Sequence, residues 1–286
     1  MLDEWVQGFN VQLPMERFDL ERLRAESGLG SLEFHSRLGS TNDFGLQLIR
    51  DKTQAHETLL YPVLILTECQ TAGRGQHQRV WNSGVGNLAC SLCLPITRER
   101  TRSLIPLAVG LAICEALERL IQGSHFQLKW PNDIVCAEKK LGGVLIEVVQ
   151  PSMTGGPIAV IGIGVNVNRP VILELDLNSV RKAPSKLTMA PISLKEQFRY
   201  EFDLTDVTIS IIRQVLTRLP MLDSDSSAML QNCDRRMVFR GKEVELVLPD
   251  RQQLRGRYVG LSDMGELLVA SEGKTVACAG ALAVSW

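Results

Sequence analysis

Four strand-like segments follow one another in the middle of this chain and are separated only by short turns. They span 126–129, 134–137, 144–149 and 158–167. Turns this short join neighbouring antiparallel strands, because a parallel pair needs a crossover of a dozen or more residues. The spacing therefore predicts an antiparallel meander. Apolar residues at helical intervals over 103–120 predict a helix before it, and helices on one face of such a sheet give an α+β fold.

The rest of the chain adds strands to this sheet and a second, smaller unit. We expect further strands at 32–38, 63–69 and 88–94, and helical segments at 19–26, 44–49 and 206–219. From Met237 onward, short alternating strands separated by turns predict a small all-β barrel of about 50 residues. The predicted division is an N-terminal extension (1–30), an α+β domain with a mixed or antiparallel sheet (31–228) and a C-terminal β domain (229–286).

Composition argues against several classes of protein. The 286 residues carry 31 basic and 32 acidic side chains, which is unlike a general nucleic-acid surface. Seven cysteines lie mostly inside apolar runs, as Cys90 and Cys93 do, which is typical of reduced thiols used as small hydrophobic side chains rather than as metal ligands. The acidic first residues are unlike a signal peptide, and no apolar run approaches the ~20 residues of a membrane span. We expect a soluble cytoplasmic protein without a metal site.

The segment 70–81 combines glycine, arginine and tryptophan directly after an apolar strand. Gly73 and Gly75 allow positive φ angles or close approach of a ligand to the backbone. Arg74 and Arg79 offer planar forks of donors for phosphate or carboxylate, and Trp81 can cover an apolar or aromatic group. The segment is typical of a loop that wraps an anionic ligand, although a glycine-rich surface loop without function has the same composition.

Two further polar motifs lie at the ends of predicted strands. Ser40, Thr41 and Asn42 precede a helical segment, where each is a good N-cap and the three together offer hydrogen bonds to a small ligand. Lys129 ends a strand just before a proline-containing turn. A lysine in this position is usually solvated, but beside the glycine-rich loop it would neutralise a phosphate.

The motifs occur together, in this order, in one family. Residues 33–168 resemble the biotin–protein ligases in carrying Ser-Thr-Asn before a helix, Gln-x-x-Gly-Arg-Gly ending in Trp, Lys-Trp-Pro-Asn-Asp, Lys-Leu-Gly-Gly-Val-Leu-Ile-Glu and Gly-Ile-Gly-Val-Asn-Val-Asn. The resemblance implies a class II synthetase-like catalytic domain and an SH3-like C-terminal barrel. It also implies two reactions: biotin attacks the α-phosphate of ATP with Mg²⁺ assistance, and a lysine of a biotin carboxyl carrier domain then takes the biotinyl group.

The resemblance also implies the residues of the site. It implies biotin-binding residues at Ser40, Thr41, Asn42, Gln70, Arg74, Gly75, Gln76 and Lys129, with the ureido end at the first four. It implies adenylate contacts at Arg79, Trp81 and Asn166. Lys129 and Arg74 are the catalytic candidates, because two anions approach each other only at a Coulomb cost that cations offset.

Some features depart from the family or leave alternatives open. Many relatives have arginine where this chain has Gln76 and glycine where it has Gln78, so we hypothesise that the adenylate is held less tightly here. By the resemblance, the segment 169–188 corresponds to a loop that in the family orders over the adenylate. About 30 residues precede the match, too few for a winged helix-turn-helix, and we expect no DNA binding.

Lipoate or octanoate ligases and transferases of the same fold are the alternative function, followed by a non-catalytic carrier-binding protein. A homodimer formed through an edge strand remains open.

Overall fold

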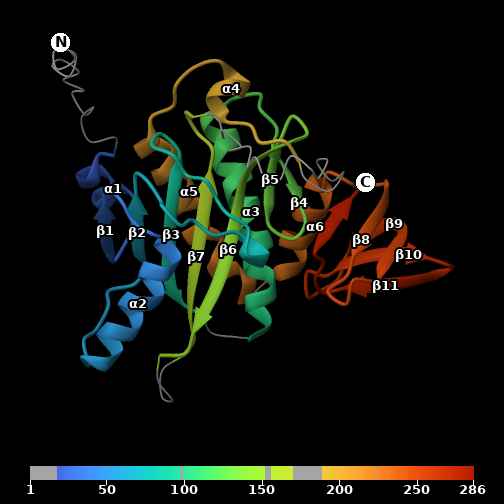
Figure 1. The fold of residues 1–286 in the computed structure, drawn as a ribbon, viewed down its shortest axis with the longest axis horizontal. Coiled ribbons are helices and arrows are strands. Elements are labelled where there is room, and N and C mark those ends of the chain that lie inside the picture. The colour runs from blue at the N-terminus through green and yellow to red at the C-terminus, as the bar shows by residue number, and fades with distance from the viewer. Residues whose placement is uncertain (1–17, 97–98, 152–155, 170–188, 224) are drawn as a thin grey trace, which may run out of the picture.

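The computed structural model describes residues 18–96, 99–151, 156–169, 189–223 and 225–286. These residues form a seven-stranded mixed sheet covered by helices and, beside it, a smaller five-stranded antiparallel sheet (Figure 1). The predicted α+β architecture with a C-terminal β unit is confirmed. Residues 1–17 of the predicted extension and 170–188 of the predicted loop over the adenylate lie outside the described residues.

The large sheet has the strand order β1-β2-β3-β7-β6-β5-β4. Its strands are β1 (Ser31–His35), β2 (Val63–Thr67), β3 (Leu88–Pro95), β4 (Gln127–Lys129), β5 (Asp133–Cys136), β6 (Lys139–Val149) and β7 (Ile158–Val165). Strands β1 and β2 are parallel, and the other described neighbours are antiparallel. The predicted meander over β4 to β7 is therefore confirmed, and it places β7 in the buried centre of the sheet.

Helices pack on both faces of this sheet. They are α1 (Leu20–Glu26), α2 (Thr41–Gln54), α3 (Glu99–Leu120), α4 (Leu194–Phe198), α5 (Leu204–Arg218) and α6 (Ser226–Arg236). Successive residues of a strand point to opposite faces, so Leu64 and Leu66 of β2 join the core beneath α3 and α5. Val63 and Ile65 instead pack with Ile49 of α2. The expectation of helices on one face thus holds for α3 and α5, while α2 covers the opposite face (Figure 1).

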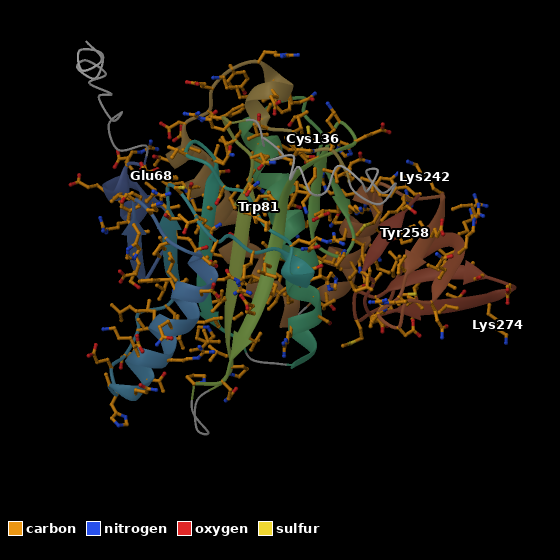
Figure 2. The ribbon with its side chains drawn as sticks, in the orientation of Figure 1. Glu68, Trp81, Cys136, Lys242, Tyr258 and Lys274 are labelled. Atoms are coloured by element: carbon orange, nitrogen blue, oxygen red, sulfur yellow. The ribbon has the colours of Figure 1, made fainter. Side chains whose placement is uncertain are left out.

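The C-terminal sheet packs against the end of the large sheet. Its order is β11-β10-β9-β8-β12, formed by β8 (Glu243–Val247), β9 (Gln253–Leu261), β10 (Leu267–Ser271), β11 (Lys274–Cys278) and β12 (Ala283–Ser285). The indole nitrogen of Trp130, a residue only 3% exposed, donates to the carbonyl of Gly265 at 2.9 Å. Lys242 and Tyr258 lie in the upper part of the small sheet as drawn, and Lys274 lies at its end far from the large sheet (Figure 2).

Helix α6 joins the two sheets and is absent from the sequence prediction. It begins after Asp225, whose carboxylate accepts from the Ala228 amide, and it buries only Met229, Leu230 and Cys233. Near its end Arg236 pairs with Glu118 of α3 at 2.5 Å. The predicted domain boundary after residue 228 falls inside this helix, and the division into domains stays a prediction.

The cysteines are buried thiols, as the sequence predicts. Only Cys69 is partly exposed among the seven, and none of them forms a disulfide. Burial raises the pKa of Cys90 and of Cys93 to about 12, so both stay protonated at neutral pH. In the described part of the chain no cluster of three metal-binding side chains occurs, and none of the described helices is long and apolar enough to span a bilayer.

Candidate active site

A cavity of about 320 Å³ lies where the start of α2, the glycine-rich loop, the β4–β5 turn and the segment before β12 meet strands β6 and β7. Every site residue singled out in the sequence lines it: Ser40, Thr41, Asn42, Gln70, Arg74, Gly75, Gln76, Arg79, Trp81, Lys129 and Asn166. Motifs that are about 130 residues apart along the chain are thus gathered around one space. The ligand group that each residue contacts stays a prediction.

Neutral hydrogen-bonding groups form one end of the cavity, which we call the polar end (Ser40, Thr41, Asn42 and Gln70). Ser40 is the N-cap of α2, so Thr41 and Asn42 start the helix with their side chains buried. The amide oxygen of Gln70 accepts from the Thr41 amide at 2.9 Å. Its nitrogen donates to Ser83 at 3.0 Å. The helix cap and a side chain from the glycine-rich loop therefore fix each other.

Ser91 of β3 holds two residues of the polar end in place, although the sequence analysis did not find it. Its fully buried hydroxyl lies 2.6 Å from Asn42 Oδ1 and 2.7 Å from Thr41 Oγ1. An amide oxygen only accepts, so Ser91 donates to Asn42, and the amide nitrogen of Asn42 donates to Glu147 at 2.8 Å. A single serine in an apolar strand carries no signal that would have revealed this role.

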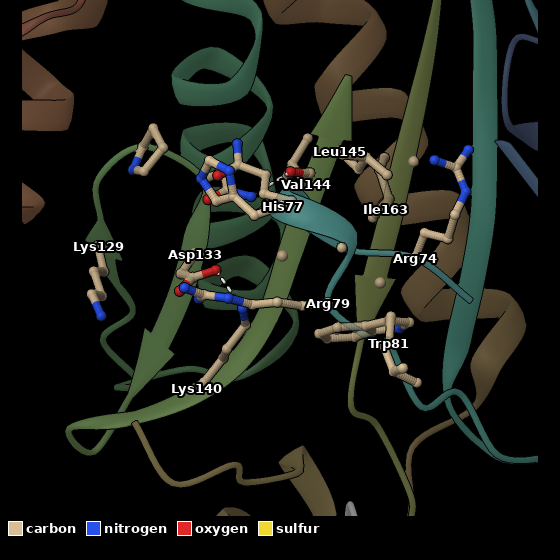
Figure 3. Close-up of a pocket in the computed structure, with 18 of the residues that line it drawn as sticks. Arg74, His77, Arg79, Trp81, Lys129, Asp133, Lys140, Val144, Leu145 and Ile163 are labelled. Atoms are coloured by element: carbon tan, nitrogen blue, oxygen red, sulfur yellow. Dashed lines mark hydrogen bonds and ion pairs between the residues drawn. The ribbon is translucent and has the colours of Figure 1, made fainter. Parts of the chain in front are cut away.

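The glycine-rich loop folds back on itself at the mouth of the cavity. A Cβ atom on Gly73 would lie 2.3 Å from the carbonyl oxygen of Trp81, so only glycine fits there. The Trp81 amide donates to the Gly73 carbonyl at 2.9 Å, and the Gly75 amide donates to the Arg79 carbonyl at 2.7 Å. These bonds aim the loop side chains in different directions, with Arg79 and Arg74 far apart (Figure 3).

Arg74 is held at the polar end and does not lie beside Lys129. Its guanidinium pairs with Asp43 of α2 and, at 3.0 Å, with Glu147 of β6. Figure 3 shows Arg74 and Lys129 at opposite ends of the cavity. The two catalytic candidates of the sequence analysis are therefore lining residues of the same cavity but not neighbours.

Three basic side chains form the other end, which we call the cationic end (Arg79, Lys129 and Lys140). Lys129 is only 8% exposed, and this burial lowers the pKa of its ammonium group, with Lys140 and Arg79 acting in the same direction and Asp133 opposing them. Lys140 pairs with Asp133 at 2.5 Å (Figure 3). Asp133 is the one acidic side chain among the described residues that line the cavity, so these residues give this end an excess of positive charge suited to phosphate or carboxylate.

Two buried polar atoms beside the cationic end find no partner among the described residues. They are the indole nitrogen of Trp81, a donor, and Oδ1 of Asn166, an acceptor. Buried polar groups are nearly always hydrogen-bonded in proteins. Trp81 also packs so closely on β7 that a Cβ atom at Gly164 would meet its ring at 2.5 Å. An aromatic face with an unmet donor and acceptor suits a heteroaromatic ligand such as a purine.

The sequence is similar to those of known ligases. Residues 37–168 match the model of the biotin/lipoate A/B protein ligase family. The biotin–[acetyl-CoA-carboxylase] ligase of Mycobacterium tuberculosis is 26% identical over 257 residues, which cover 88% of each chain. Over most of its length the chain is therefore similar in sequence and fold to biotin–protein ligases. The bifunctional ligase/repressor BirA of Escherichia coli is 24% identical, over 93% of this chain and 78% of that protein.

Solved structures of biotin–protein ligases have the same fold. The ligase from Aquifex aeolicus in complex with biotin and ATP superposes with a TM-score of 0.69 at 25% identity, covering 89% of this chain and 98% of that one. Within this family fold, the glycine-rich loop and the Lys-Trp-Pro-Asn-Asp turn line the cavity as described. Sequence reasoning missed Lys140, although it begins the fourth quoted motif, and the backbone near Leu282, which no motif covers.

Proposed function

We propose that this chain activates biotin with ATP and transfers it to a lysine of a protein. One observation carries the proposal: a single cavity joins buried neutral hydrogen-bonding groups to a cluster of three basic side chains, one of which is the buried Lys129. The polar end suits a ureido group, which both donates and accepts hydrogen bonds. The cationic end suits the meeting of a carboxylate with a triphosphate.

In the first reaction the residues bind, orient and stabilise charge. A carboxylate oxygen of biotin forms a bond to the α-phosphorus of ATP while the bond to pyrophosphate breaks, and pyrophosphate leaves with the electron pair. The carboxylate is ionised at neutral pH, so no general base is needed. Lys129 and Arg79 offset the repulsion between the two anions. The unpartnered atoms of Trp81 and Asn166 support binding of the adenine nucleotide beside them.

The described residues that line the cavity offer one carboxylate to a divalent cation. Mg²⁺ is commonly held by one or two carboxylates together with substrate phosphates and water. Asp133 is the carboxylate available among the lining residues, and it would share a cation with the triphosphate. When bound, Mg²⁺ would neutralise phosphate charge there.

In the second reaction a carrier lysine replaces AMP. Its uncharged amine forms an amide bond with the carbonyl carbon of biotin, the bond to the phosphate oxygen breaks, AMP leaves and the amine proton passes to solvent. We propose a biotin carboxyl carrier domain of a carboxylase as the acceptor and the cytoplasm as the place of reaction. We also propose that the chain does not bind DNA, which titration with a DNA duplex tests. A homodimer through an edge strand such as β1 is a further part of the proposal, and sedimentation tests it.

Exchange of labelled pyrophosphate into ATP tests the first reaction. We expect exchange with biotin, none with lipoate or octanoate, and a loss of about 100-fold or more in Lys129→Ala, the size seen when an oxyanion donor is removed. Exchange with lipoate or octanoate instead would favour the alternative ligases of this fold. A folded protein that exchanges with none of the three acids would be a binding protein.

A further inference from the structure

Trp286 brings an aromatic ring from the C-terminal sheet to Lys129. The Lys129 Nζ atom lies 5.3 Å from the centre of the indole ring, within the distance at which a cation is attracted to an aromatic face. Lys129 ends β4 in the large sheet, whereas Trp286 directly follows β12 in the small one. The contact therefore crosses between the two sheets.

The position of Trp286 is set by its neighbours in the small sheet. Its ring packs edge-to-face on Phe239 with centroids 5.8 Å apart, and Phe239 is fully buried. Val284, two residues earlier, is 4% exposed and anchors β12. The carbonyl of Leu282 accepts a hydrogen bond from the Arg79 guanidinium at 2.8 Å. The segment 282–286 thus contacts two of the three basic side chains of the cationic end.

An indole ring is a suitable support for a cation that must act on phosphate. A carboxylate would attract the ammonium more strongly but would also cancel its charge, as Asp133 does for Lys140 at 2.5 Å. The ring face attracts the ammonium through its quadrupole and carries no net charge. Burial disfavours the charged form of Lys129, while Asp133 favours it. The ring adds attraction for the ammonium without adding a further anion that would compete with an anionic ligand.

We propose that Trp286 is a positioning residue for Lys129, so that the C-terminal sheet completes the reaction site. The inference rests on the proposed function, because Lys129 acts there on the carboxylate and the α-phosphate. Cation–π attraction in proteins corresponds to about 2- to 30-fold in an equilibrium constant. This sets the size of the effect expected when the ring is removed.

The test compares Trp286→Leu, Trp286→Phe and Lys242→Gln in pyrophosphate exchange. Lys242 is the matched control because its Nζ lies 5.8 Å from the same ring, on the small sheet. We expect Trp286→Leu to lower kcat by about 2- to 30-fold with the KM for biotin little changed. Phenylalanine, which keeps a ring face, should restore most of the rate, and Lys242→Gln should stay within about twofold of the wild type. In the Lys129→Ala background, Trp286→Leu should have no further effect.

The inference is overturned if Trp286→Leu and Trp286→Phe lose equal activity, if Lys242→Gln loses as much, or if the loss persists without Lys129. A fall in melting temperature that accounts for the lost activity would likewise reduce Trp286 to a structural residue.

A readout independent of activity is the ¹³Cε resonance of Lys129 in lysine-labelled protein, identified by its absence in Lys129→Ala. The indole ring current should shift it, and Trp286→Leu should abolish the shift. An unshifted resonance refutes the contact, whereas a wild type that shows the shift but no exchange refutes only the proposed function.

Discussion

Replacing Gly162 with alanine tests whether the polar end of the cavity binds biotin. A Cβ atom at this position would lie 2.5 Å from Oδ1 of Asn42 and 3.1 Å from its Cγ. Ordinary contacts between heavy atoms begin near about 3.5 Å, so one group must move by roughly 1 Å. Strand β7 cannot retreat, because it pairs with β3 on one side and β6 on the other. The side chain of Asn42 must therefore move.

The expected loss of biotin affinity follows from the hydrogen bonds that the Asn42 side chain would lose. Its oxygen accepts from Ser91 at 2.6 Å and its nitrogen donates to Glu147 at 2.8 Å. Leaving one buried polar group unsatisfied costs about 1–3 kcal/mol. If the ureido group binds here, the dissociation constant of biotin should rise by about 5- to 150-fold. If ATP binds at the cationic end, as we propose, its dissociation constant should change by less than about threefold.

Calorimetric titration with biotin and with ATP measures both constants. Gly84→Ala is the matched control, because a Cβ atom there meets nothing within 4 Å. Thermal unfolding of each variant shows whether the protein remains folded at the titration temperature. A folded Gly162→Ala protein that binds biotin as tightly as the wild type would refute the assignment of the polar end to the ureido group.

Three further predictions concern the cationic end and the glycine-rich loop. Gly164→Ala places a Cβ atom 2.5 Å from the Trp81 ring, so the KM for ATP should rise by about tenfold or more with biotin binding retained, as exchange kinetics would show. Gln76→Arg adds a cation at a residue that lines the cavity, and should slow release of the biotinyl adenylate by about fivefold or more in a chase experiment. Burial lowers the pKa of Lys129 from its ordinary 10.5. If the ammonium is the active form, as we propose, kcat/KM for biotin should fall as pH rises through a midpoint below 10.5, and Lys129→Arg should abolish this fall.

The sequence predicts those parts of the fold in which local pattern and burial agree. Strands β2 and β3 are apolar runs bounded by polar residues, and β7 is buried along nearly its whole length. Helix α6 fails this condition, since most of its residues are polar and face solvent while tertiary contacts such as Arg236–Glu118 hold it. Strand β11 escapes prediction for a similar reason, because four of its five residues are exposed.

In the candidate site, too, the residues that can be predicted are those set by local sequence pattern, and the others depend on tertiary contacts. Residues within short motifs, such as Ser40 to Asn42, are found because neighbours in sequence stay neighbours in the cavity. Ser91 is missed because its role arises from strand register: it lies opposite Gly162, whose missing side chain leaves space for Asn42. The contact between Arg79 and Leu282 spans 203 positions and depends on how the two sheets pack. No local pattern encodes such a contact.

The distribution of charge in the cavity changes the expected role of Arg74. Its guanidinium pairs with the two carboxylates of Asp43 and Glu147, so this cluster contributes no net positive charge towards a phosphate. Lys129 and Arg79 carry the positive charge, at the opposite end of the cavity (Figure 3). The Glu147 carboxylate also accepts a hydrogen bond from the side-chain amide nitrogen of Asn42 at 2.8 Å. We therefore expect Arg74 to influence ligand binding mainly by holding Glu147, and through it Asn42, in place at the polar end.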